Sequence, residues 1–323
     1  MTFRQDIEDF LTYCLLVKQY SFNTIRNYRN TLERMANFFE SIKIFKTKDI
    51  DLIAINRYRQ YLSQQTSIRK NNLALKSQSY QIVVFRSFLK YMLKQGHLVL
   101  NPDNLELPRA RMRRIEFLSE QEIKKLVHTI ITDKTIPTLQ RKRNQAIILT
   151  IFGSGLRLSE VLSLKKSDIS NQDNRLIIQG KGGKVRTAFL SPHSREAIRE
   201  YLLERKADNN PYLFISHSKN NSSQSPSPKP LTPRMIQLML QKYAQMSGIF
   251  KKITPHTLRH SFATKILFEG GDLRSVQTLL GHSSISTTQI YTHVTDWQIQ
   301  DLHSKVFGKS SRTKKAKYSS KKL

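Results

Sequence analysis

Four side chains in the last quarter of the chain have the types and the spacing that phosphodiester chemistry needs. His256 and Arg259 stand three residues apart, His282 directly follows a glycine, and Tyr291 comes nine residues after His282. An arginine fork can bind two phosphate oxygens, and a histidine can move a proton near neutral pH. Together the four predict a site that acts on a phosphodiester.

A helix that begins at residue 255 would position the first two of these side chains. Thr254 suits the N-cap and Pro255 the first helical position. His256 and Arg259 would then share a face near the positive end of the helix, where anions bind. The same pattern also fits an ordinary surface pair at a helix start. On these two residues alone the ordinary pair is favoured, because short motifs often match by chance.

A second charged pair follows a glycine turn at residues 153–155. The run Gly-Ser-Gly-Leu-Arg157-Leu-Ser-Glu160 predicts a tight turn that carries Arg157 to the start of the next helix. Glu160 would hold that arginine in position, and a plain carboxylate on the helix face fits the spacing equally well. The turn therefore adds a second candidate phosphate ligand, while the role of Glu160 stays open.

A glycine-rich hairpin presents a lysine. Residues 175–179 and 185–190 predict two strands, joined by Gly-Lys181-Gly-Gly-Lys with its turn at 180–184. The run is not a phosphate-binding P-loop, because both the strand-loop-helix context and the GxxxxGK[ST] spacing are missing. Taken alone, Lys181 fits a solvated turn lysine.

Boundary signals predict two more helices in this half of the chain. Residues 119–122, Ser-Glu-Gln-Glu, form a capping box before an apolar run. Asp272 is expected to cap a helix that ends at Leu280, with Gly281 directly after it. His282 would then emerge at the end of that helix.

The first part of the chain predicts a helical unit that binds DNA. Apolar residues recur at helical spacing through residues 1–98, whereas Pro102 and Pro108 interrupt a basic stretch at 99–116. Each basic side chain alone fits a solvated charge, but together they suggest a clamp on the DNA backbone. The candidate contacts are Arg26, Arg29, Lys76 and Arg86 of the helical unit and Arg109, Arg111, Arg113 and Arg114 of the basic stretch.

The charge balance points to the same partner. The 323 residues include 54 Lys and Arg against 24 Asp and Glu, a formal net charge of +30. Such an excess repels itself unless a polyanion is near, so nucleic acid is the favoured partner and an anionic membrane surface the lesser one. The single cysteine, Cys14, excludes an internal disulfide and a cysteine-rich metal site. No signal peptide and no membrane-spanning apolar run is evident, so we expect a cytoplasmic protein associated with the nucleoid.

As a set, these motifs closely resemble those of the tyrosine recombinase (phage integrase) family, over almost the whole chain. The Tyr-Thr-His-Val sequence at the last motif and the compact length resemble the Xer branch. The motifs are Gly-Ser-Gly-Leu-Arg157-Leu-Ser-Glu160, Gly-Lys181-Gly-Gly-Lys-Val-Arg, His256-Thr-Leu-Arg259-His260, Leu-Gly-His282 and Tyr291.

The resemblance implies a mainly α fold with a small β-sheet, closed around DNA as a C-shaped clamp. A helical core-binding domain of the SAM-like kind would span residues 1–98, followed by the linker at 99–116. An α+β catalytic domain would span 117–308. Residues 309–323, with seven Lys or Arg and no acid, would form a disordered basic tail.

The resemblance also implies a role for each site residue. Tyr291 would attack the phosphodiester to give a 3′-phosphotyrosyl link and a free 5′-hydroxyl. His256 would be its general base, and Lys181 would protonate the departing oxygen. The phenol of Tyr291 needs a general base because a phenol ionises near pH 10 when unperturbed.

The other site residues would bind the phosphate. Arg157 and Arg259 would hold the two non-bridging oxygens, His282 would hydrogen-bond a phosphate oxygen, and Glu160 would orient the site. No metal and no cofactor is expected, since two arginines can neutralise the charge and the covalent link conserves the bond energy.

The resemblance implies double-stranded DNA recombination sites as the substrate and a homo- or heterotetramer on two duplexes as the active form. A second recombinase and a DNA translocase are further candidate partners. Resolution of chromosome or plasmid dimers is the leading interpretation, and an integrase or excisionase of a phage or mobile element is the main alternative. A catalytically silent DNA-binding protein and a type IB topoisomerase fit less well.

Overall fold

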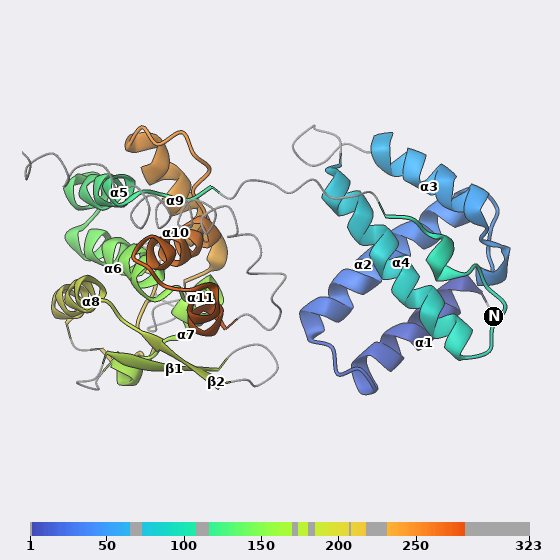
Figure 1. Ribbon diagram of the computed structural model, residues 1–323, viewed down its shortest axis with the longest axis horizontal. Coiled ribbons are helices and arrows are strands. Elements are labelled where there is room, and N and C mark those ends of the chain that lie inside the picture. The colour runs from blue at the N-terminus through green and yellow to red at the C-terminus, as the bar shows by residue number, and fades with distance from the viewer. Residues whose placement is uncertain are drawn as a thin grey trace, which may run out of the picture. The chain divides into compact units, whose positions relative to one another are not determined.

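The protein is described here by a computed structural model that covers residues 2–64, 73–107, 116–169, 174–179, 185–206, 208–217 and 231–281. The chain divides into two compact units, Met1–Met112 and Arg113–Leu323. Helices dominate both units, and the second also holds a two-stranded sheet (Figure 1). The predicted fold class, mainly α with a small sheet, is confirmed.

Four long helices build the first unit, and a capping box on Thr2 and Gln5 begins the first of them. Apolar residues at helical spacing turn one face of each helix inward. The elements are α1 (Phe3–Leu16), α2 (Phe22–Ser41), α3 (Leu52–Gln64) and α4 (Leu75–Lys94), with single 3-10 turns η1 (Thr47–Asp49) and η2 (Pro102–Asn104).

Aromatic rings fill the centre of this unit. Phe3 contacts Phe39, Phe85 and Phe88 with ring centroids 5.5–6.2 Å apart, in edge-to-face arrangements. Burying one such ring stabilises the fold by about 1.5–3 kcal/mol. The first unit therefore has a hydrophobic core of its own.

The end of the first unit includes residues that the sequence analysis assigns to the linker. Leu105 is buried in the helical core, and Val99, Leu100 and Leu107 pack against it. Helix α4 ends at Lys94, but apolar side chains beyond it still pack in the core. Residues 99–107 thus belong structurally with the helices before them.

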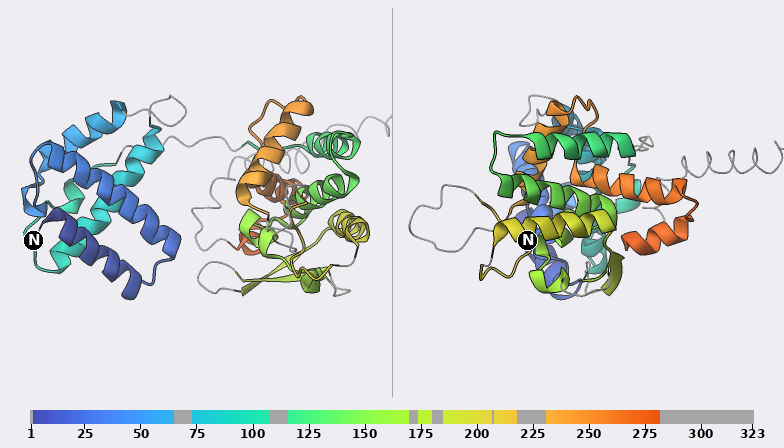
Figure 2. Two further views of the ribbon diagram at one scale, coloured as in Figure 1. Left: turned by 180° about the vertical axis from the view of Figure 1, so that it is seen from behind. Right: turned by 90° about the vertical axis from the view of Figure 1, so that its left-hand side faces the viewer.

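Helix α6 (Thr138–Ser154) lies at the centre of the second unit. It packs against α5, α8 and α10 (Figure 1, and from two further sides in Figure 2). The other elements are α5 (Glu120–Thr132), α7 (Leu158–Ser163), η3 (Lys166–Ile169), β1 (Arg175–Gln179), β2 (Val185–Phe189), α8 (Pro192–Arg205), α9 (Pro233–Met246), α10 (Pro255–Phe268) and α11 (Leu273–Leu280).

The hairpin forms where the sequence predicts it. Strands β1 and β2 pair antiparallel, with Arg175 opposite Phe189 and Ile178 opposite Arg186. Strand β2 also packs against α6 and α11. Because side chains alternate between the two faces of a strand, Arg186 shares a face with the buried Ala188. One strand thus carries a basic side chain toward the interior.

The predicted helix boundaries in this unit are confirmed. Ser119 and Glu122 make the capping box of α5. Asp272 accepts a hydrogen bond from Ser275 N at the start of α11. Gly281 ends that helix with φ +62°, a left-handed conformation that favours glycine.

Candidate active site

The predicted start of helix α10 is present and is held firmly. Thr254 Oγ1 accepts a hydrogen bond from Thr257 N at 3.1 Å, and Pro255 occupies the first turn. Thr257 Oγ1 donates to Lys252 O at 3.0 Å, which ties the first turn to the preceding loop. On this helix His256 is exposed, whereas Arg259 is only 5% exposed. The helix therefore presents a histidine above a buried arginine.

Arg259 reaches from α10 to the ends of two other helices. Its Nη1 donates to Gly155 O and its Nη2 to Leu280 O, both at 2.6 Å. Gly155 is the left-handed residue that ends α6. A Cβ on that glycine would lie 2.4 Å from Phe262 Cδ1, so the close approach also requires glycine. The buried guanidinium thus joins α6, α10 and α11.

Arg157 and Glu160 are in contact, which decides between the two interpretations of Glu160 that the spacing left open. Arg157 Nη1 donates to Glu160 Oε1 at 3.0 Å, and Arg157 N donates to Glu160 Oε2 at 2.7 Å. Glu160 has a side chain only 7% exposed, whereas that of Arg157 is 36% exposed. The carboxylate caps the start of α7 and holds an arginine that still reaches the surface.

The end of helix α11 binds three arginines through three successive carbonyl oxygens. The C-terminal end of a helix carries partial negative charge and unpaired carbonyls, so cations bind there. The three arginines come from the start of α7, from β2 and from α10, which lie side by side around α11 (Figure 1). The pairs are Arg186 Nη1 with Leu279 O at 3.1 Å, Arg259 Nη2 with Leu280 O at 2.6 Å, and Arg157 Nη2 with Gly281 O at 3.2 Å.

The same three arginines surround one carboxylate. Arg186 Nη2 donates to Glu160 Oε2 at 2.8 Å, and Arg259 Nη1 lies 3.9 Å from the same oxygen. With Arg157 on Oε1, three positive charges face one negative charge. We call Arg157, Glu160, Arg186 and Arg259 the arginine cluster. Its excess of positive charge suits it to an anion.

The histidines of α10 are shifted toward the neutral form. The ring of His256 reaches the surface, but partial desolvation by the surrounding protein lowers its pKa, and the positive charges of Arg259 and Arg157 lower it further. Burial, followed by the charges of His256 and Arg259, lowers the pKa of His260 to about 4. Both imidazoles are therefore neutral at pH 7, which is the form that accepts a proton.

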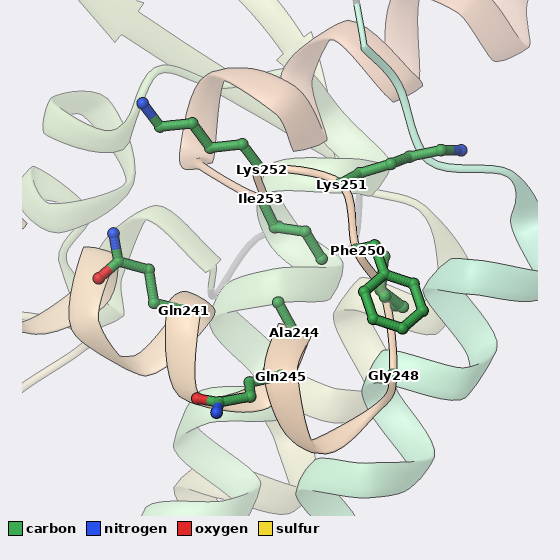
Figure 3. A pocket seen from close by; sticks show the side chains of 9 residues that line it. Gln241, Ala244, Gln245, Gly248, Phe250, Lys251, Lys252 and Ile253 are labelled. Atoms are coloured by element: carbon green, nitrogen blue, oxygen red, sulfur yellow. The ribbon is translucent and has the colours of Figure 1, made fainter.

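A pocket of about 280 Å³ lies at the end of α9 and the loop that leads to α10 (Figure 3). Ala244, Ile249 and Ile253 give it an apolar wall, and Lys251 and Lys252 extend away from it in opposite directions. Lys251 Nζ pairs with Glu122 at 2.8 Å. The lining residues do not include the arginine cluster, so this pocket is separate from the candidate site.

Two family models match the chain. The model of the phage integrase family matches residues 116–297, and the model of the phage integrase SAM-like domain matches residues 7–106. The chain belongs to the phage integrase family. It is a tyrosine recombinase, an enzyme of DNA strand exchange.

Curated relatives extend over nearly the whole recombinase. It is 33% identical to tyrosine recombinase XerC of Oceanobacillus iheyensis, over 93% of this chain and 94% of the relative. It is 36% identical to tyrosine recombinase XerA of Pyrococcus furiosus, over 91% of each chain. Its fold is similar to that of the XerH site-specific recombinase in a crystal structure with palindromic difH substrate after cleavage. That likeness has a TM-score of 0.69 at 22% identity, covering 92% of this chain and 84% of the other.

Three of the six expected catalytic residues lie in the described part of the recombinase. Arg157 and Arg259 belong to the cluster, and His256 is close enough for the charges of both arginines to lower its pKa. The other three, Lys181, His282 and Tyr291, lie outside the described residues. The arginines of the basic stretch, Arg109, Arg111, Arg113 and Arg114, lie outside them as well.

Arg186 is the cluster member that sequence reasoning missed. It closes the motif Gly-Lys181-Gly-Gly-Lys-Val-Arg, where one more basic residue reads as a solvated hairpin charge. The missed signal is the strand alternation, which places Arg186 on the same face as Ala188. An arginine on an inward strand face needs an acidic or carbonyl partner, and Glu160 is the acid in reach.

The candidate DNA contacts of the first unit differ in how tightly the protein itself holds them. Arg29 forms an ion pair with Glu8, and Arg86 Nη2 lies 3.1 Å from Asp103 Oδ1. Arg26 donates to the neutral amide oxygen of Asn23 at 3.2 Å. Paired arginines must leave or share their carboxylates to bind a phosphate. Lys76 and Arg34 line the same hollow on this unit. Arg34 was not among the predicted DNA contacts.

Two other findings concern the described residues. Within the described ranges, no group of three or more His, Cys, Asp or Glu side chains is placed to hold a metal ion. Of the helices seen there, none has both the length and the apolar character needed to cross a membrane.

Proposed function

We propose that this recombinase is of Xer type and that it cuts and rejoins DNA at specific sites to resolve chromosome or plasmid dimers. The arginine cluster beside a neutral histidine carries the proposal, because it offers excess positive charge and a proton acceptor at one place. The relatives named XerC and XerA support the Xer assignment.

In the proposed cleavage step, Tyr291 Oη attacks the scissile phosphorus while His256 accepts the phenol proton. The bond from phosphorus to the 5′-oxygen breaks, and Lys181 gives a proton to that oxygen. The products are a 3′-phosphotyrosyl link and a free 5′-hydroxyl. The lowered pKa of His256 supports its role as the base, since the neutral imidazole is ready at pH 7.

The phosphate gains a second negative charge as it becomes pentavalent, and the positive charge of the cluster would stabilise it. Arg157 and Arg259 would donate to the non-bridging oxygens, with His282 adding a further hydrogen bond. Glu160 positions Arg157 through the contacts at 2.7 and 3.0 Å. Preorganised donors of this kind stabilise a transition state without moving at the moment of reaction.

Rejoining is the reverse reaction with a different strand. The 5′-hydroxyl of the partner strand attacks the phosphotyrosine and gives its proton to the neutral Lys181. The bond from phosphorus to Tyr291 Oη breaks, His256 returns the proton to that oxygen, and the new phosphodiester forms. The link conserves the bond energy of the original phosphodiester. We therefore propose that the reaction consumes no ATP and needs no metal ion.

We propose a tetramer on two duplexes as the active form, acting at the nucleoid in the cytoplasm, with a second recombinase and a DNA translocase as candidate partners. An integrase of a mobile element would have the same active site and differ in its DNA. The sequence that flanks the gene separates the two: a dimer-resolution site supports the Xer role, and an attachment site supports an integrase.

A suicide substrate tests the chemistry. A nick just beyond the scissile phosphate lets the released fragment diffuse away, so a covalent protein–DNA adduct accumulates. We expect the adduct to form at the same rate in excess chelator as in magnesium, measured on denaturing gels. Adduct that appears only with magnesium would contradict the metal-free mechanism.

The pH dependence of cleavage tests the role of His256. Its pKa lies below the ordinary value of 6.5, so the base stays neutral and active as the pH falls through that value. Single-turnover cleavage at subsaturating DNA, which reports the free enzyme, should therefore lose rate only below pH 6.5. In His256→Gln the acid limb should vanish together with most of the rate. If the acid limb of the pH–rate profile is unchanged in His256→Gln, that limb belongs to the titration of another group.

A further inference from the structure

Arg186 is nearly enclosed by the site. Its side chain is 11% exposed, and its two terminal nitrogens bond in different directions. Nη2 donates to Glu160 Oε2 at 2.8 Å, and Nη1 donates to Leu279 O at 3.1 Å. One guanidinium thereby links strand β2 to the start of α7 and to the end of α11.

The stem of Arg186 runs directly over Gly281. A Cβ on that glycine would lie 2.4 Å from Arg186 Cδ and 2.5 Å from its Nε. Because Gly281 also has φ +62°, glycine is required there both by the turn and by the arginine above it. Arg186 thus packs on the backbone that leads to the next residue, the predicted phosphate ligand His282.

The two oxygens of Glu160 are shared unequally. Oε1 accepts from Arg157 Nη1, whereas Oε2 accepts from both Arg157 N and Arg186 Nη2. Arg259 lies 3.9 Å from Oε2 and bonds instead to the carbonyls of Gly155 and Leu280. Arg186 Nη2, at 2.8 Å, is thus closer to Oε2 than Arg259 Nη1 is.

We propose that Arg186 is a positioning residue for cleavage, which rests on the function proposed above. It supplies the positive charge that Glu160 needs and anchors the last turn of α11, so that Arg157 and Arg259 keep their places around the scissile phosphate. Arg186 also adds the third positive charge of the cluster. With three arginines and one carboxylate, the cluster then has the net positive charge that balances a doubly negative transition state. Arg186 itself acts through Glu160 and the α11 carbonyl.

Substitutions separate the charge of Arg186 from its geometry. Arg186→Gln removes the charge, and Arg186→Lys keeps it but loses the fork that reaches two acceptors at once. Arg199→Gln is a matched control, because Arg199 pairs with Glu196 on the exposed surface of α8, and the two side chains are 63% and 52% exposed. Each full-length variant is compared with the wild type by melting temperature and by affinity for duplex DNA.

The decisive measurement is single-turnover cleavage of the suicide duplex at saturating DNA. We expect Arg186→Gln to cleave on the order of 100-fold more slowly, as small misplacements of reacting groups do, with its DNA affinity retained. Arg186→Lys should fall between Arg186→Gln and wild type, and Arg199→Gln should match wild type. A methylphosphonate at the scissile position removes the charge that the arginines neutralise, so on that substrate the defect of Arg186→Gln should shrink.

The outcomes distinguish the two proposals. If wild type forms the adduct and Arg186→Gln forms it equally fast, the role of Arg186 is refuted and the proposed function stands. An equal defect on the phosphodiester and the methylphosphonate would also refute the role. If Arg186→Gln does not fold, Arg186→Lys carries the test, and wild-type cleavage by that variant refutes the role. If wild type forms no adduct, the proposed function fails, and this inference fails with it.

Discussion

Replacing Tyr291 by phenylalanine abolishes the covalent protein–DNA adduct and leaves DNA binding intact: this is the largest effect that we expect. The phenol oxygen is the proposed nucleophile, and phenylalanine has no oxygen that could form the bond to phosphorus. Loss of a nucleophile of this kind lowers turnover by on the order of 10⁴-fold or more. Denaturing gels with the suicide substrate measure the adduct, and gel shifts of the same duplex measure binding.

Tyr212→Phe is the matched control. Tyr212 is 42% exposed and lies in the same unit of the chain as Tyr291. Removing its hydroxyl therefore tests whether the loss of any tyrosine hydroxyl disturbs cleavage. We expect wild-type adduct from this variant. An adduct that persists in Tyr291→Phe would move the nucleophile to another residue and overturn the proposed mechanism.

Glu160→Ala should strongly destabilise the second unit. The substitution removes the one carboxylate among three arginines, two of which, Arg186 and Arg259, have side chains 11% and 6% exposed. Removing one partner of a buried charged network costs about 3–5 kcal/mol, because the other charges stay buried without compensation. For a unit of this size that corresponds to a fall in melting temperature of roughly 6–20 °C.

Two comparisons make the result specific. Glu196→Ala breaks an ion pair of similar spacing on the exposed face of α8, and its melting temperature should stay at the wild-type value. Duplex DNA should raise the melting temperature of Glu160→Ala more than that of wild type, because a bound phosphate supplies the missing negative charge. Equal melting temperatures of Glu160→Ala and wild type would show that the cluster does not depend on its carboxylate.

Local sequence signals predicted most of the fold. Capping residues such as Thr254 and Asp272 and the left-handed Gly281 mark helix ends by contacts with residues a few positions away, and all three are where the sequence places them. The hairpin strands follow from the same kind of local pattern. Local interactions are written in the sequence at fixed spacing, so they can be read without the structure.

The contacts within the site are of a different kind. Arg259 bonds to carbonyls 104 and 21 residues away, and Arg186 to one that is 93 residues away. A backbone carbonyl has no signature in the sequence, because every residue carries one. The three-residue spacing allowed the pairing of Arg157 with Glu160 without deciding it. It gave no sign that Arg186 and Arg259 converge on the same carboxylate.

The boundary of the first unit shows a similar limit. Helix α4 ends at Lys94 and Pro102 begins the 3-10 turn η2. A proline-containing stretch between two units suggests an exposed linker. The structure instead buries Leu105 in the helical core. Proline fixes the local backbone but does not decide which surface the neighbouring apolar side chains cover.

The position of helix α11 late in the sequence determines when the arginine cluster can form during translation. All three arginines of the cluster are made before their acceptors at residues 279–281, and Arg157 precedes its carbonyl by 124 residues. A nascent chain that has not yet emerged to this point carries the arginines without the helix end that gathers them. The contacts that gather the three arginines can therefore form only after residues 279–281 have left the ribosome.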